Sequence, residues 1–199
     1  MTTREAGEKL GVAVRTVQLW VEAGLLPAWR TAGGHRRIAR GAVEALMAER
    51  AQVFAKSPTA IAVVDPVDKP RAQVRVLVVE DDPMQLRLTL QVLETWQLPL
   101  LLCSASNGFE ALLRIGEDRP DLVITDLHMP GMDGFQMLQA LKQVGSGYET
   151  MTVVAVSALS PDQVALAGGL APGVTFLPKP VHYGELEALV RPLVAKMLS

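Results

Sequence analysis

The chain has 199 residues, of which 49% are apolar and 20% are charged. This ordinary composition excludes a chain that is disordered throughout, and the length suits two small domains better than one. The net charge of −2 is unevenly divided: residues 1–50 hold eight basic and five acidic residues, the remainder eleven and sixteen. A basic N-terminal unit suits contact with phosphate backbones.

The first 54 residues predict three helices and a hairpin. We expect helices over Arg4–Leu10, over Val14–Ala23 and from Ala42 to about Phe54, with glycines ending the first two. Between the last two helices, Leu25–Ile38 indicates two extended arms around a glycine turn.

The second of these helices has two distinct faces. Its apolar residues recur at helical spacing and should pack inward: Val14, Val17, Trp20 and Val21. The opposite face then carries Arg15, Thr16, Gln18, Leu19 and Glu22. We also expect Trp20 and Trp29 to belong to the core rather than to stack on nucleic-acid bases.

Residues 55–73 contain Pro66, Pro70 and several charges, which indicates a linker. Beyond it, apolar runs alternate with amphipathic segments. Strands are expected over Val74–Val79, Leu100–Ala105, Leu122–Thr125, Thr152–Val156 and Val174–Leu177. Helices are expected over Met84–Trp96, Gly108–Glu117, Phe135–Val144, Pro161–Ala167 and Gly184–Met197. This alternation predicts an α/β fold with a doubly wound, five-stranded parallel sheet.

The sequence also lacks the usual signs of export or membrane insertion. No basic segment followed by an apolar run opens the chain, and stretches such as Leu98–Cys103 are too short to cross a bilayer. The single Cys103 cannot form an internal disulfide. We therefore expect a cytoplasmic protein without a membrane partner.

Polar and charged residues directly follow the predicted strands. They lie at the carboxyl ends of the strands, which is where parallel sheets bind ligands. Glu80, Asp81 and Asp82 follow the first strand, and Asp126 follows the third. Ser157 and Lys179 follow the fourth and fifth. Clustered carboxylates need a cation, and oxygen ligands with open positions suit Mg²⁺. A carboxylate can attack phosphorus to form an acyl phosphate, while a lysine and the metal offset the phosphoryl charge.

Residues 74–199 resemble a response-regulator receiver domain along their whole length. The matching stretches are Val76–Pro83, Pro120–Gly134, Val156–Ala158 and Phe176–Pro180. The resemblance implies a flavodoxin-like sheet of order 2-1-3-4-5, phosphorylation of Asp126 by a sensor histidine kinase or phosphotransfer protein, and no enzymatic role beyond its own phosphotransfer and dephosphorylation. It also implies Mg²⁺ held by Glu80, Asp81, Asp126 and the backbone carbonyl of His128, with Ser157, Lys179 and Phe176 sensing the phosphoryl group.

Residues 1–52 resemble the winged helix-turn-helix domain of MerR-type regulators and excisionase-like proteins. The matching stretches are Thr3–Ala6, Leu10–Val12, Arg15–Trp20, Ala23–Pro27 and Thr31–Ile38. The resemblance implies binding to double-stranded DNA through Arg4, Arg15, Thr16, Gln18, His35, Arg36 and Arg37. Gln18 and Leu19 replace the Arg-Tyr pair common in that family, so its base preference is not carried over. The long helical region and dimerising coiled coil of MerR-type proteins are also missing, which argues against a metal or drug sensor.

The sequence thus predicts a DNA-binding domain over residues 1–54, a linker over 55–73 and a receiver over 74–199. We interpret the chain as a response regulator that controls transcription and forms a homodimer at least when phosphorylated. One alternative is a phosphorelay or protein-interaction regulator whose N-terminal domain binds a protein instead of DNA. Another is a DNA-binding regulator that works independently of phosphorylation.

Overall fold

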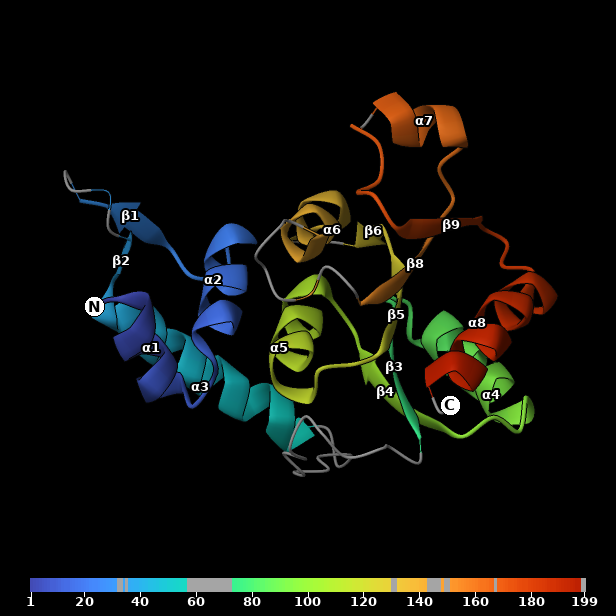
Figure 1. The fold of residues 1–199 in the computed structure, drawn as a ribbon, viewed down its shortest axis with the longest axis horizontal. Coiled ribbons are helices and arrows are strands. Elements are labelled where there is room, and N and C mark those ends of the chain that lie inside the picture. Colours follow the sequence, from blue (N-terminus) through green and yellow to red (C-terminus); the bar gives the residue numbers. More distant parts are fainter. Residues whose placement is uncertain are drawn as a thin grey trace. The chain divides into compact units, whose positions relative to one another are not determined.

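The computed structural model describes residues 1–31, 34, 36–56, 73–129, 132–142, 148, 151–166 and 168–197. The chain divides into two compact units (Figure 1). The N-terminal unit comprises Met1–Ala62 together with Ala140–Glu149, and the α/β unit comprises Val63–Gln139 together with Thr150–Ser199. Most of the linker predicted over 55–73 lies outside the described residues.

The N-terminal unit contains the predicted three helices and hairpin. Its elements are α1 (Thr3–Leu10), α2 (Val14–Glu22), β1 (Ala28–Arg30), β2 (Arg36–Ile38) and α3 (Arg40–Lys56). Helix α1 begins with a capping box, in which Thr2 accepts the Glu5 backbone N–H and the Glu5 carboxylate accepts that of Thr2. It ends at Gly11, whose φ of 70° is in the left-handed region that favours glycine.

The α/β unit is built on a five-stranded sheet. The strands are β3 (Val74–Val79), β4 (Leu100–Ala105), β5 (Leu122–Asp126), β8 (Thr152–Ser157) and β9 (Val174–Pro178). All neighbouring pairs are parallel, and the spatial order is β4-β3-β5-β8-β9. This is the flavodoxin-like order 2-1-3-4-5, so the predicted fold class is confirmed.

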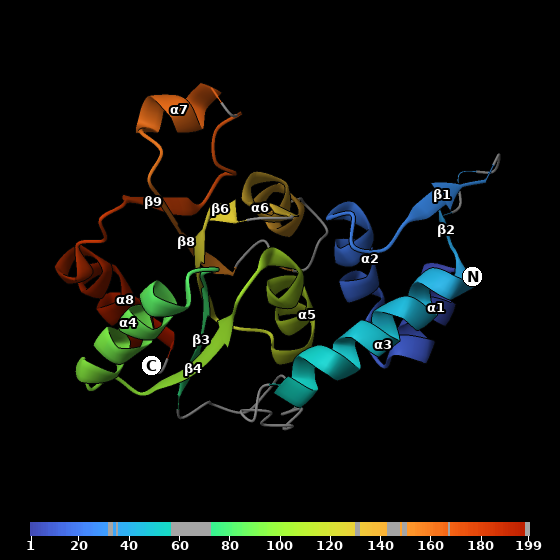
Figure 2. The same ribbon diagram turned by 180° about the vertical axis from the view of Figure 1, so that it is seen from behind.

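Helices cover both faces of this sheet. The helices of this unit are α4 (Pro83–Thr95), α5 (Gly108–Asp118), α6 (Gly134–Lys142), α7 (Pro161–Leu166) and α8 (Tyr183–Met197). Helices α4 and α8 lie together on one face, and α5 and α6 lie on the other (Figure 2). A short hairpin that the sequence did not predict, β6 (His128–Met129) with β7 (Met132–Asp133), follows β5.

The core explains why the strands are apolar on both sides. Val76, Val78 and Ile124 of the central strands pack with Trp96 after α4 and Leu186 of α8 in one buried cluster. Strands covered on both faces lose the alternation of half-exposed strands and become continuous apolar runs. Polar residues therefore begin where each strand leaves this core, at its carboxyl end.

Within the described parts of the chain, no helix has both the length and the apolar character needed to cross a membrane.

Candidate functional site

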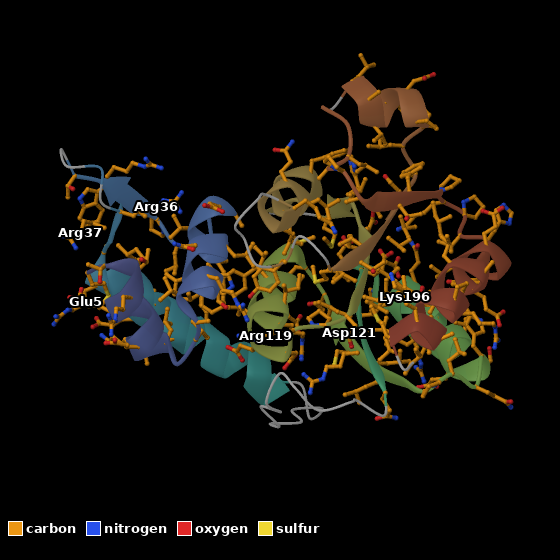
Figure 3. The ribbon with its side chains drawn as sticks, viewed as in Figure 1. Glu5, Arg36, Arg37, Arg119, Asp121 and Lys196 are labelled. Carbon is orange, nitrogen blue, oxygen red and sulfur yellow. The ribbon has the colours of Figure 1, made fainter. Side chains whose placement is uncertain are left out.

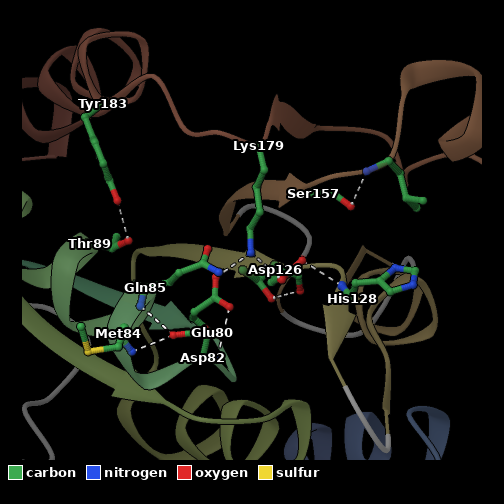
Figure 4. A network of polar contacts seen from close by, with 12 residues as sticks. Glu80, Asp82, Met84, Gln85, Thr89, Asp126, His128, Ser157, Lys179 and Tyr183 are labelled. Carbon is green, nitrogen blue, oxygen red and sulfur yellow. Dashed lines mark hydrogen bonds and ion pairs between the residues drawn. The ribbon is translucent and has the colours of Figure 1, made fainter.

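A lysine joins two carboxylates at the carboxyl ends of the strands. Lys179 follows β9, and its Nζ lies 2.8 Å from Oε2 of Glu80 and 2.7 Å from Oδ2 of Asp126 (Figure 4). Glu80 and Asp126 are both buried, at 8% and 7% exposure. Buried carboxylates need a compensating charge, which the Lys179 ammonium provides.

Hydrogen bonds from neighbouring residues also hold Asp126 in place. Its Oδ1 accepts the backbone N–H of His128 at 2.9 Å. Its own carbonyl oxygen accepts the hydroxyl of the buried Thr125 at 2.8 Å. The His128 side chain is exposed. These contacts fix the carboxylate at the end of β5, as an acceptor of incoming groups requires.

The other acidic residues after β3 have different surroundings. Asp82 caps α4, accepting the backbone N–H of Met84 at 2.8 Å and that of Gln85 at 3.0 Å. The Gln85 and Met84 hydrogen bonds lower the pKa of Asp82. Asp81 is exposed. Asp82 therefore serves as a helix cap, which leaves Glu80 and Asp81 available to the site.

Charge and burial act in opposite directions on this cluster. Burial raises the pKa of Glu80, although the hydrogen bond from Lys179 opposes the change. Burial alone would lower the pKa of Lys179, but hydrogen bonds to Asp126 and Glu80 outweigh it, and the pKa is raised. Lys179 is therefore a permanent cation at neutral pH.

Glu80, Asp81 and Asp126 could together hold a cation. One carboxylate oxygen from each lies within 4.8 Å of the others. An all-oxygen donor set is the kind that Mg²⁺ prefers. The residues present fit the predicted ion, and the predicted role of the His128 carbonyl stays a prediction.

Two of the three predicted sensing residues, Ser157 and Phe176, lie on neighbouring strands. Ser157 ends β8 and is fully buried, and its hydroxyl oxygen accepts the Leu159 backbone N–H at 3.2 Å. The Ser157 carbonyl accepts the Lys179 backbone N–H at 2.8 Å. Phe176 is half-buried in β9, in register with Ala155 of β8. Ser157 is thus tied directly to the segment that carries Lys179.

Residues 76–191 match the protein family described as response regulator receiver domain. The chain belongs to this family. A probable C4-dicarboxylate response regulator from Priestia megaterium is 32% identical over 117 residues, which is 59% of this chain and 45% of that protein. The two-component response regulator ARR2 of Arabidopsis thaliana is 35% identical over 125 residues, or 63% of this chain and 18% of that protein. The match therefore spans less than half of these relatives.

Solved receiver structures share the same fold. A putative response regulator from Chloroflexus aurantiacus J-10-fl superposes with a TM-score of 0.54 at 27% identity, covering 62% of this chain and 98% of that one. The signal receiver domain of a DNA-binding response regulator (merR) from Colwellia psychrerythraea 34H gives a TM-score of 0.53 at 31% identity. It covers 62% of this chain and 99% of the solved one.

The region before the receiver matches a second family. Residues 1–51 match the family described as helix-turn-helix domain, which confirms the coarser part of the N-terminal prediction. Arg15 of α2 is exposed, and Arg4 of α1 is exposed and pairs with Glu8 at 3.2 Å. His35, also predicted to contact DNA, lies outside the described residues.

Three of the predicted DNA contacts, one on the second helix and two on the hairpin, lie at an open concavity of about 410 Å³. It is lined by Gln18 of α2, by Arg36 and Arg37 of β2, and by Thr2, Thr3 and Gly34. Figure 3 shows Arg36 and Arg37 on the hairpin. Arg36 Nη1 also lies 2.9 Å from Glu22 Oε1, which ties β2 to α2. The structure thus brings Gln18, Arg36 and Arg37 together.

The predicted outer face of α2 needs two corrections. Thr16 is fully buried, and its hydroxyl lies 3.0 Å from that of Tyr148 in the same unit, so in this structure it is not an exposed DNA contact. Leu19 is also fully buried, whereas Val14, expected to face inward, is 40% exposed. Burial of an apolar leucine is favourable, so α2 is covered over more of its circumference than one amphipathic stripe suggests.

The two N-terminal tryptophans also differ from each other. Trp20 is fully buried, as predicted, but Trp29 is 54% exposed, so its assignment to the core was wrong. The alternation of side chains along a strand could have revealed this, because Trp29 pairs with Arg37 and not with Ile38.

Proposed function

We propose that this chain is a two-component response regulator in which phosphorylation of Asp126 changes DNA binding by the helix-turn-helix unit and so controls transcription. The supporting observation is that Asp126 is buried, bonded to Lys179 and close to Glu80 and Asp81. The same chain carries a helix-turn-helix domain.

The group transferred would come from a phosphohistidine of a sensor histidine kinase or phosphotransfer protein. A carboxylate oxygen of Asp126 attacks phosphorus, the P–N bond breaks, and its electron pair returns to the imidazole nitrogen. Lys179, already 2.7 Å from Asp126, compensates the charge of the phosphoryl oxygens. Water then hydrolyses the acyl phosphate, which releases inorganic phosphate and restores the Asp126 carboxylate. We propose no other substrate for this site.

Glu80, Asp81 and Asp126 would hold Mg²⁺ during this transfer. When bound, the ion would neutralise negative charge on the phosphoryl group. The contribution of the chain is to keep these carboxylates together at one edge of the sheet, with Lys179 opposite them.

The change at Asp126 would reach the surface through Ser157 and Phe176. A phosphoryl oxygen offers the Ser157 hydroxyl a new acceptor, and Ser157 is joined to Lys179 through the backbone. A shift of Ser157 and the half-buried Phe176 changes the surface of β8 and β9. Phosphorylation would thereby shift the equilibrium between two conformations of this surface.

Base and phosphate contacts would come from the N-terminal unit. Arg15 and Gln18 of α2 suit the edges of bases, and Arg36 and Arg37 suit phosphates. A single unit of this size buries limited DNA surface, so we propose that the phosphorylated chain binds as a homodimer.

The test is binding to a labelled duplex from the region upstream of the gene, at physiological salt, with Mg²⁺ and with or without acetyl phosphate. We expect the phosphodonor to change the affinity and sedimentation of the wild type, and to change neither for Asp126→Asn. Asp162→Asn, an exposed position in α7, is the matched control and should respond like the wild type.

Each alternative predicts a distinct result. Equal DNA binding by the wild type and Asp126→Asn under all conditions would favour a phosphorylation-independent regulator. No sequence-preferring binding at all would favour the reading in which the N-terminal domain binds a protein.

A further inference from the structure

We propose that the outer face of the β1–β2 hairpin, formed by Trp29 and Arg37, is a DNA contact in which the Trp29 indole packs against sugars and base edges of a groove. The inference rests on the proposed DNA-binding function and adds a contact that none of the predicted residues provides. All of those residues are polar, whereas Trp29 offers a large apolar surface.

The exposure of Trp29 is the first observation. The chain has three tryptophans, and Trp20 and Trp96 are 0% and 8% exposed, whereas Trp29 is 54% exposed. An indole is among the largest apolar groups that a side chain can bury, and exposed tryptophan is enriched where partners bind. Trp29 therefore contributes little to the buried core of this unit.

The strand register shows which way Trp29 faces. The cross-strand pairs are Ala28 with Ile38, Trp29 with Arg37, and Arg30 with Arg36. Ile38 is fully buried, so its face of the hairpin is the core face. Since side chains alternate along a strand and paired residues share a face, Trp29 and Arg37 lie on the opposite, outer face.

The ion pair of Arg36 agrees with this assignment. Arg36 lies on the same face of β2 as Ile38, and its guanidinium reaches Glu22 of α2. That pair holds the core face of the hairpin against the helix. The outer face is therefore presented in a fixed orientation.

The charges around Trp29 select the partner. The strands β1 and β2 contain Arg30, Arg36 and Arg37 and no acidic residue, and of these three arginines Arg36 pairs with Glu22 of α2. A partner must then combine negative charge with an apolar or π surface. A DNA groove does so, because phosphates line its walls while sugars and base edges form its floor.

Tryptophan fluorescence tests the contact directly. Because the other two tryptophans are buried, acrylamide quenching of the wild type should come mainly from Trp29 and fall to a low level in Trp29→Phe. Adding the upstream duplex should lower quenching of the wild type towards that level. Quenching that is unchanged at saturating duplex would overturn the inference.

Affinity measured by anisotropy of the labelled duplex provides the second readout. We expect Trp29→Ala to weaken binding by about tenfold with an unchanged salt dependence, since the indole neutralises no phosphate. Arg37→Ala should lower the salt slope by about one. Met47→Ala, an exposed apolar position on α3, is the control and should bind like the wild type.

The outcomes separate this inference from the function on which it rests. If the wild type binds the duplex and Trp29→Ala binds equally well, the Trp29 contact is overturned and the proposed function stands. If the wild type binds no duplex, both are overturned, and a Trp29 protected instead by an acidic protein would identify the hairpin as a protein-binding surface.

Discussion

In the receiver the buried carboxylates Glu80 and Asp126 pair with Lys179, whereas in the N-terminal unit Arg4 and Arg15, both predicted to meet DNA, lie at the surface. Glu80 and Asp126 share the ammonium of Lys179 within 2.8 Å. Arg4 and Arg15 are exposed, and Arg4 pairs with Glu8 one turn along its own helix. A buried charge must be compensated by an opposite charge within its own domain, whereas an exposed charge is available to a binding partner.

The largest expected effect is a complete separation of the two activities. Asp126→Asn should abolish incorporation of radioactive phosphate from a phosphodonor, because the amide is not a nucleophile. Arg15→Ala should leave incorporation unchanged and weaken binding to the upstream duplex by about tenfold, since each lost base or phosphate contact costs about that much. If Arg15→Ala impairs phosphorylation, the two regions are not functionally distinct as proposed.

The next effect concerns stability. Lys179→Ala should lower the free energy of unfolding by about 2–3 kcal/mol in the absence of divalent metal, because Glu80 and Asp126 then remain buried without a cation. Arg4→Ala, which breaks an exposed pair, should cost only about 0.3–0.5 kcal/mol. Urea denaturation measures both.

Added Mg²⁺ should sharpen this contrast. It should restore part of the stability lost in Lys179→Ala, because the ion replaces the missing positive charge among the carboxylates. Equal urea midpoints for Lys179→Ala with and without Mg²⁺ would argue against the proposed metal site.

A third effect tests the loop after β5. A Cβ on Gly134 would lie 2.8 Å from the carbonyl oxygen and 2.9 Å from Cα of Leu127, next to Asp126. Gly134→Ala should therefore destabilise the receiver by about 1–3 kcal/mol. A Cβ on Gly184 in α8 meets nothing within 4 Å, so Gly184→Ala should be neutral or slightly stabilising in thermal melts.

The smallest effect concerns helix α2. Its N-cap is Ala13, which makes no side-chain capping bond, whereas Asp82 caps α4 with two. Ala13 has the extended conformation of a cap, with φ −64° and ψ 151°, so Ala13→Ser should stabilise the N-terminal unit by about 0.5–1 kcal/mol. Amide hydrogen exchange of the first turn of α2 should slow; an unchanged rate would indicate that the helix end is already held by its surroundings.

The receiver could be predicted almost completely from the sequence. Strands such as Val74–Val79 are covered on both faces, so their composition alone identifies them, and the parallel order brings the residues after them together. The predicted helix Phe135–Val144 starts one residue after the observed α6 of Gly134–Lys142, which is an ordinary difference at a helix end, and its last two residues lie outside the described residues. Glu80, Asp126 and Lys179 were expected at one edge and are bonded there.

The N-terminal surface could not be predicted to the same degree, because its side chains depend on distant neighbours. Thr16 is buried beside Tyr148, which is 132 residues away in the chain. The exposure of Trp29 depends on the register of β1 with β2, and the need for Gly134 depends on how closely Leu127 approaches it. Local periodicity contains none of this information.

The strand order has a consequence for how the domain is made. Glu80 and Asp126 end the central strands β3 and β5, while Lys179 follows β9, which is added last at the outer end of the sheet. During synthesis the carboxylates leave the ribosome 99 and 53 residues ahead of their ammonium partner. Until β9 is in place, the nascent domain carries a cluster of uncompensated negative charge, which a solvent cation can neutralise while the domain is still incomplete.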